Sequence, residues 1–180
     1  FILPYSSPNA AAAPGGVLFV TGGLLKMVES ESELVSVLGH EIGHVELGHC
    51  MDLVRFQLLA EKMEARPLGE IADLAVGIML LPSFSKTQEA DADRYGFQML
   101  IKESYNPFGM ANAFEKLAAL DPDAMESANP LTEYFRSHPY SILRAERYRS
   151  EATQADLERY YVGERNLKER ISRFDTEYPD

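Results

Sequence analysis

Three of the four histidines in this 180-residue chain lie close together, in the sequence LGHEIGHVELGHC from Leu38 to Cys50. Apolar side chains around them recur every three or four residues, and Ser30 or Ser32 stands where a helix N-cap is preferred. This pattern predicts an amphipathic helix over residues 31–49. No other feature constrains the fold as strongly, because a helix determines which of these side chains share a face.

Helical spacing separates the roles of the first two histidines and of the glutamate between them. His40 and His44 are four residues apart, so they lie on one face with Cβ atoms roughly 5–6 Å apart. Two imidazoles at that separation can bind one zinc ion at about 2.0–2.1 Å each. Glu41 is rotated by about 100° from His40, which makes it a poor third ligand from this helix. It is well placed to take a proton from a water held on the metal, and the H-E-x-x-H pattern predicts this catalytic role.

His49 and Cys50, at the end of this stretch, are predicted not to bind the metal. His49 is nine residues past His40 and, on a continuous helix, faces roughly the opposite way. Metzincins place a third ligand ten residues after the first histidine and a glycine at the seventh. Cys50 and Leu47 occupy those places here, so the helix is expected to continue past them. We therefore expect Cys50 to be a buried small hydrophobe.

The third metal ligand is predicted to come from the sequence KTQEADADRYGF, in a helix expected over residues 85–104. Glu89 and Asp93 are four residues apart and share a face, whereas Asp91 points away. One of these two carboxylates can bind the metal while the other accepts the free N–H of a ligand histidine. Such acidic pairs are common on solvated helix faces, and only their position after an H-E-x-x-H helix makes this pair informative.

The rest of the chain predicts a mostly helical α+β fold in a single domain of residues 1–180. Residues 1–22 are β-like, and Pro14 to Gly16 mark a turn that folds an extended segment, Asn9 to Ala13, against Val17 to Thr21. After Ser30 the apolar spacing is helical, and prolines separate the segments. The helices expected besides that of residues 31–49 cover residues 51–65, 67–81, 85–104, 107–120 and 140–161.

Composition excludes several classes of function. The net charge is −11 and no run of Lys or Arg occurs, so binding to nucleic acid has no electrostatic support. A single cysteine allows no intrachain disulfide, and it disfavours a structural zinc site, which usually has four cysteine-rich ligands. The most apolar stretch, residues 71–81, is too short to span a bilayer. No signal-peptide pattern opens the chain, and its start at Phe1 is compatible with the earlier removal of an export signal.

Taken together, these residues resemble the M48 zinc metallopeptidases, over most of the chain. Four elements carry the resemblance, in the same order as in the family. They are NAAAAPGGVLFVTGGLL, with an Asn-Ala segment and a Gly-Gly turn before a strand; the helix ELVSVLGHEIGHVELGH; EADADRYGF, which fits the pattern E-x-x-A-D; and SHPYSILR, a His-Pro element with an arginine six residues on. The length and the lack of membrane spans are similar to the soluble or periplasmic bacterial branch.

The resemblance implies a zincin-like fold with a small sheet packed over the active-site helix. It assigns one zinc ion to His40, His44 and Glu89, with Asp93 and Arg144 supporting the ligands from outside. It places His138, on a loop stiffened by Pro139, where it can donate to the oxyanion or, alternatively, block the metal. An extended peptide substrate would pair with Asn9, Ala10 and Ala11. At Ala11 the family usually has a larger residue, often Phe, so the pocket beside this segment differs.

The function expected is a zinc-dependent endopeptidase for protein substrates in cell-envelope quality control, located in the periplasm or at a membrane. Glu41 acts in it as the general base. One alternative is a binding protein, a chaperone or adaptor on the same fold, which would have no use for Glu41. Another alternative is a latent protease, blocked by a further segment or by a side chain on the metal. The pattern specifies neither the substrate sequence nor the oligomeric state.

Overall fold

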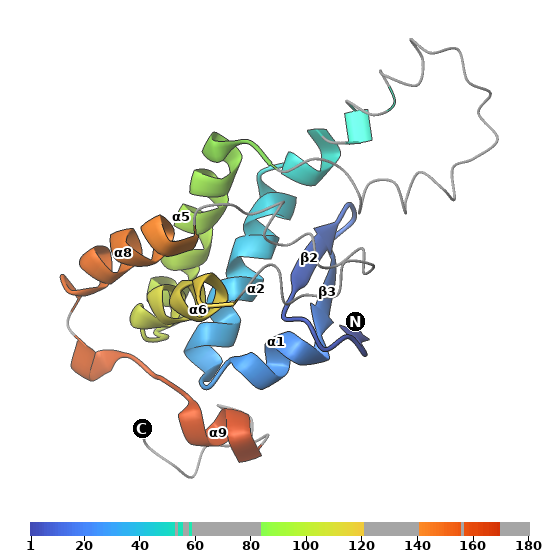
Figure 1. Cartoon of the computed structure of the whole chain (residues 1–180). Helices are drawn as coiled ribbons and strands as arrows, with labels where there is room; N and C mark the ends of the chain where they lie inside the picture. Colours follow the sequence, from blue (N-terminus) through green and yellow to red (C-terminus); the bar gives the residue numbers. More distant parts are fainter. Residues whose placement is uncertain (53, 56–57, 59–83, 121–140, 156, 170–180) are drawn as a thin grey trace.

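The computed structural model describes the chain except for residues 53, 56–57, 59–83, 121–140, 156 and 170–180 (Figure 1). The described residues form helices and one three-stranded sheet. The predicted mostly helical α+β fold is therefore confirmed. The helices expected over residues 51–65 and 67–81 lie mostly or wholly outside the described residues, as does the loop with His138 and Pro139.

The sheet has the strand order β1-β3-β2. The strand β1 (Ile2–Leu3) pairs in parallel with β3 (Val17–Thr21), and β2 (Ala10–Ala13) pairs antiparallel with the same strand. The turn at residues 14–16 joins β2 to β3, as the sequence predicted. Since β3 is central, β2 is an edge strand of the described sheet. It also lies against helix α2 (Glu31–Glu46), so the sheet covers one side of that helix.

Two helices begin where side chains cap their first turns. Thr21, the last residue of β3, caps the short helix α1 (Gly22–Met27) by accepting from the Leu24 N–H, and sequence periodicity had not indicated this helix. Ser30 caps α2 by accepting from the Glu33 N–H. Of the two candidate caps at this end, the structure uses Ser30.

The prediction that the first long helix continues to residue 49 is wrong. The helix α2 ends at Glu46, and Gly48 adopts a φ of 78° in the turn that follows. A left-handed glycine is a usual way to terminate a helix. Because Leu47 stands where metzincins have a glycine, we predicted that the helix continues. Gly48, one residue later, ends it instead. Residues 49–52 are again helical but follow a new direction.

For the other helices, the observed starts agree with the predicted starts more closely than the observed ends agree with the predicted ends. The helix α5 (Lys86–Lys102) opens with a capping box between Ser85 and Gln88, and α6 (Phe108–Ala118) follows Pro107. The last predicted helix, over residues 140–161, is too long. It appears as α8 (Ser141–Ala152), and the hydroxyl of Thr153 donates to the Ser150 carbonyl at its end. The short η3 (Leu157–Arg159) and α9 (Glu164–Glu169) complete the described chain.

Helices α2 and α5 pack along a seam of small residues. A methyl group on Gly43 would lie 3.0 Å from Ala92 Cα, and one on Gly96 would lie 2.8 Å from the His40 backbone nitrogen. Glycine within a helix costs about 1 kcal/mol relative to alanine. Here that cost is offset by a close approach of the backbones, which brings the His40 face of α2 against the Glu89 face of α5.

The core lies around α6, which packs on α2 and α8 (Figure 1). Its largest apolar cluster joins buried side chains from α5, α6 and α8, namely Leu100, Met110, Phe114, Leu117, Ala145 and Tyr148. No helix among the described residues is long and apolar enough to cross a membrane.

Candidate metal centre

His40, His44 and Glu89 converge at the contact between α2 and α5. Their possible ligand atoms all lie within 4.8 Å of one another, and all three side chains are buried. The two histidine Nε2 atoms are 3.1 Å apart. Glu89 Oε2 lies 3.6 Å from His40 Nε2, and Glu89 Oε1 lies 3.2 Å from His44 Nε2. Since three candidate ligand atoms face one point, the cluster has the arrangement of a metal site.

The dimensions of the cluster fit one tetrahedral metal ion. Ligand atoms bound at about 2.0–2.1 Å in a tetrahedron are about 3.3–3.4 Å from each other. The distances between Nε2 of His40, Nε2 of His44 and the Glu89 carboxylate oxygens, 3.1 to 3.6 Å, bracket that value. Among the residues that the structure describes, the cluster supplies three ligands, one fewer than a tetrahedral ion takes.

Asp93 and Arg144 contact two of these side chains. Asp93 Oδ1 lies 2.9 Å from His40 Nδ1, so the ring can donate its second N–H to that carboxylate. Arg144 Nε donates to Asp93 Oδ2 at 2.8 Å, and its Nη1 lies 3.1 Å from Glu89 Oε2. The guanidinium also lies 4.2 Å from the centre of the Phe114 ring. Arg144 therefore has two carboxylate partners, Asp93 and Glu89.

Glu41 directly follows His40 in α2 and is only 1% exposed. Cys50 lies within electrostatic range of the Glu41 carboxylate. Burial, and then the Glu41 carboxylate, raise the pKa of the Cys50 thiol to about 11. The predicted burial of Cys50 is confirmed, and its Sγ donates to the Ala12 carbonyl of β2 at 3.7 Å. Cys50 is not one of the clustered metal ligands.

His49 and Phe84 are two neighbours of the cluster that the sequence did not identify. The prediction that His49 faces away from the site is wrong, because its Nδ1 lies 3.0 Å from His44 Nδ1. Burial lowers the pKa of His49, while the charges of Asp91, Asp52 and Glu89 oppose that shift. Phe84 stacks on the His44 ring with centroids 3.8 Å apart. Two features of the sequence could have indicated these contacts. Gly48 can turn the chain after the helix, and Phe84 stands just before the Ser85 cap.

The remaining predicted site residues fall into three groups. Asn9 and Ala10 are buried, Ala11 is half-buried, and all three lie on the sheet edge beside α2. Asp91 is outside the cluster, as predicted, and its Oδ1 lies 3.4 Å from Arg94 Nη2. His138 lies outside the described residues, so its predicted role stays a prediction.

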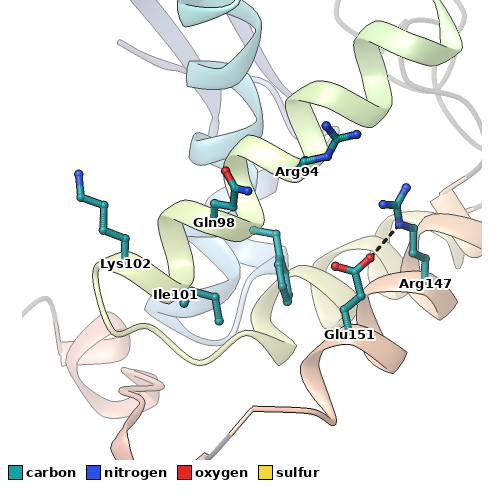
Figure 2. Close-up of a pocket in the computed structure, with 7 residues that line it drawn as sticks. Arg94, Gln98, Ile101, Lys102, Arg147 and Glu151 are labelled. Atoms are coloured by element: carbon teal, nitrogen blue, oxygen red, sulfur yellow. Dashed lines mark hydrogen bonds and ion pairs between the residues drawn. The ribbon is translucent and has the colours of Figure 1, made fainter.

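A groove between α5 and α8 contains none of the clustered ligands (Figure 2). It is lined by Arg94, Phe97, Gln98, Ile101, Lys102, Arg147 and Glu151. Within it Arg147 Nε donates to Glu151 Oε1 at 3.0 Å, while Arg94 pairs with Asp91. Lys102 Nζ lies 3.9 Å from Glu103 Oε1, so the charged side chains of this groove pair with neighbouring residues and do not form a cluster of ligands.

Comparisons with known proteins identify one family and several relatives. The profile of peptidase family M48 matches residues 2–152. The chain is 32% identical over 158 residues to the metalloprotease YcaL of Escherichia coli (strain K12), which covers 80% of this chain and 58% of that protein. It is also 32% identical over 151 residues to the metalloprotease LoiP of the same organism, covering 78% of this chain and 57% of LoiP. A beta-barrel assembly-enhancing protease of Yersinia pestis is 31% identical over 162 residues, or 81% of this chain and 32% of that protein. The chain thus spans little more than half the length of the first two relatives.

Proposed function

The chain belongs to peptidase family M48, and from this premise we propose that it is a zinc-dependent endopeptidase whose single domain occupies residues 1–180. The observation that carries the proposal is the buried cluster of His40, His44 and Glu89, together with the buried Glu41 that directly follows His40 in α2. Two imidazoles and one carboxylate form a ligand set typical of zinc peptidases with an open fourth position. One zinc ion per chain is therefore proposed as the cofactor.

A zinc ion held by His40, His44 and Glu89 would supply Lewis acidity to a water molecule and to the carbonyl group of a peptide bond. The residues of the chain then supply the proton transfers. Glu41 accepts the proton of the attacking water and passes it to the leaving amine. A buried carboxylate suits this role, because it is held in place and surrounded by little competing solvent. Asp93 and Arg144 hold His40 and Glu89 in the orientation that the metal requires.

The edge of the sheet is proposed to bind the substrate as an added strand. Asn9 O accepts from Thr21 N, so this opposed pair is hydrogen-bonded. Such pairs alternate with non-bonded ones along an antiparallel ladder, so the next pair, Ala10 with Val20, directs the Ala10 main-chain groups away from β3. Ala12 repeats this orientation, in agreement with the bond that its carbonyl accepts from Cys50. We therefore propose that an extended peptide pairs with the segment Asn9 to Ala13 through Ala10 and Ala12, a mode that reads little side-chain sequence. Asn9 and Ala11, which were also predicted to pair with the substrate, direct their main-chain groups towards β3 by the same alternation.

His138 is proposed, from the sequence alone, to donate to the oxyanion of the tetrahedral intermediate. Preorganised donors of this kind stabilise the charge that develops on the carbonyl oxygen. The alternative proposed from the sequence is a latch, in which the same imidazole occupies the open metal position. The two roles predict opposite effects when the histidine is removed.

The biological role is proposed to be protein quality control in the cell envelope, with the protein in the periplasm or at a membrane. Support comes from one relative of the chain, which is named a beta-barrel assembly-enhancing protease. The substrates of this chain would be protein segments presented in extended form. The competing proposal is an adaptor or chaperone on the same fold, which Glu41 beside the ligands disfavours.

Casein cleavage by wild type and Glu41→Gln, both loaded with zinc, tests this function. Glutamine keeps the size of the side chain but cannot accept the proton. Wild type is expected to cleave casein, to lose activity with a chelator and to regain it with zinc. Glu41→Gln is expected to bind zinc equally well without cleaving. A wild type that binds casein but never cleaves it would support the adaptor instead.

A further inference from the structure

His49 contacts His44 on the side of the ring that faces away from the other ligands. The two Nδ1 atoms are 3.0 Å apart and the ring centroids 5.1 Å apart, and both side chains are buried. The contact exists because Gly48, with a φ of 78°, lies in the turn that interrupts the helix after α2, so His49 does not keep the helical phase of His44. On a continuous helix the two rings would have pointed apart.

The atoms that make this contact determine which histidine donates. In the cluster, the atom of His44 that faces His40 and Glu89 is Nε2. A neutral imidazole that uses Nε2 as a metal ligand carries its proton on Nδ1. His44 Nδ1–H is then the donor, and His49 Nδ1 must accept. His49 in turn carries its own proton on Nε2.

We propose that His49 is a positioning residue that fixes the tautomer and ring orientation of His44, as the Asp93 carboxylate does for His40. This inference rests on the zinc site proposed above. The partner of a ligand histidine is usually a carboxylate, a backbone carbonyl or a water. Here one ligand has the carboxylate of Asp93 and the other an imidazole, which adds no negative charge. The negatively charged Asp93 would then support His40, and the uncharged imidazole of His49 would support His44.

Neighbouring contacts hold His49 and His44 in this geometry. Phe84 stacks on the face of His44 at 3.8 Å between centroids and lies 6.2 Å from the centre of the His49 ring. Cys50, the next residue after His49, donates to the Ala12 carbonyl of β2. The turn after α2 is thereby attached to the sheet edge, so His49 is not free to swing away from His44.

Zinc affinity, measured in competition with a chromophoric chelator, tests the proposal without any assay of activity. His49→Leu keeps apolar bulk but removes the acceptor, and it should weaken zinc binding about 10–100-fold. His49→Asn can place Oδ1 where Nδ1 was, so it should recover most of that loss. Met51→Ala, an exposed position in the same turn of helix, should bind as wild type does. Equal binding by wild type and His49→Leu would overturn the proposal, as would equal losses in the leucine and asparagine variants.

Two further measurements separate positioning from folding and from the proposed function itself. Urea unfolding of the metal-free proteins shows whether His49→Leu merely destabilises the fold. Long-range ¹H–¹⁵N spectra of the zinc-loaded wild type need no variant, and they should show a protonated Nδ1 on His44 and an unprotonated Nδ1 on His49. The reverse assignment would reject the inference while leaving the zinc site intact. If the wild type bound no zinc at all, the proposed function would fail first.

Discussion

His40 Nδ1 and Asp93 Oδ1 lie 2.9 Å apart, with both side chains buried between α2 and α5. This places an acceptor behind the histidine, on the opposite edge of the ring from the Nε2 that faces His44 and Glu89. Asp93 is itself held by Arg144, through Nε at 2.8 Å. The orientation of His40 on α2 therefore depends on Asp93 of α5 and on Arg144 of α8.

Asp93→Asn should weaken zinc binding by about 10–100-fold, because the amide is a poorer acceptor for the His40 N–H. Asp91→Asn is the matched control on the same helix. Asp91 is half-exposed and lies outside the cluster, so this change should leave the affinity as it is. Chelator competition on both variants provides the comparison. Equal losses would show that the carboxylate of Asp93 has no special relation to the ligand.

Gly96→Ala should destabilise the protein and weaken metal binding together. Helix propensity alone would make alanine better by about 1 kcal/mol. The new methyl group would instead lie 2.8 Å from the His40 backbone nitrogen, so α5 must move away from α2. Overpacking of this kind costs about 1–3 kcal/mol. Urea unfolding measures the cost, with Gln98→Ala on the exposed face of α5 as control. A more stable Gly96→Ala protein would contradict the close packing.

Cys50 should react slowly with iodoacetamide in the native protein. Its pKa is raised to about 11, so at pH 8 only about one thiol in a thousand is ionised, against about a quarter for an ordinary cysteine. Burial slows the reaction further. The rate at pH 8 should be at least about 10²-fold lower than in denaturant, and removal of metal with a chelator should leave it low. A large increase on metal removal would show that the thiol is a ligand.

His138→Ala should lower kcat by about 10²–10³ and keep the zinc, if this imidazole donates to the oxyanion. A rise in activity would instead reveal a latch that the side chain had imposed on the metal. Peptide hydrolysis by wild type, His138→Ala and the neighbouring Ser137→Ala distinguishes these outcomes. Unchanged activity in both variants would show that His138 acts neither as an oxyanion donor nor as a latch.

Much of the arrangement around the cluster could be predicted because helical spacing is regular. The i,i+4 pairs His40 with His44 and Glu89 with Asp93 only require that each helix forms, and the structure brings both pairs together. The hairpin of β2 and β3 could be predicted equally well, because Pro14 to Gly16 separate two apolar runs. These features depend on short stretches of sequence.

The rest depended on single residues that redirect the chain, or on contacts between distant segments. The position of His49 could not be predicted while α2 was assumed to continue, because a turn with a left-handed glycine interrupts the helix and changes its phase. The partners of Arg144 lie more than fifty residues before it, and no periodicity connects them. The helix α1 is only six residues long and is capped by a strand residue, so its apolar pattern is too short to detect.

The location of the metal in crystals of the zinc-loaded protein tests the central claim most directly. Anomalous difference maps on either side of the zinc absorption edge should show one site per chain. We predict a peak about 2.0–2.2 Å from Nε2 of His40, Nε2 of His44 and a carboxylate oxygen of Glu89. A peak elsewhere, or one that includes Cys50 in place of Glu89, would contradict it.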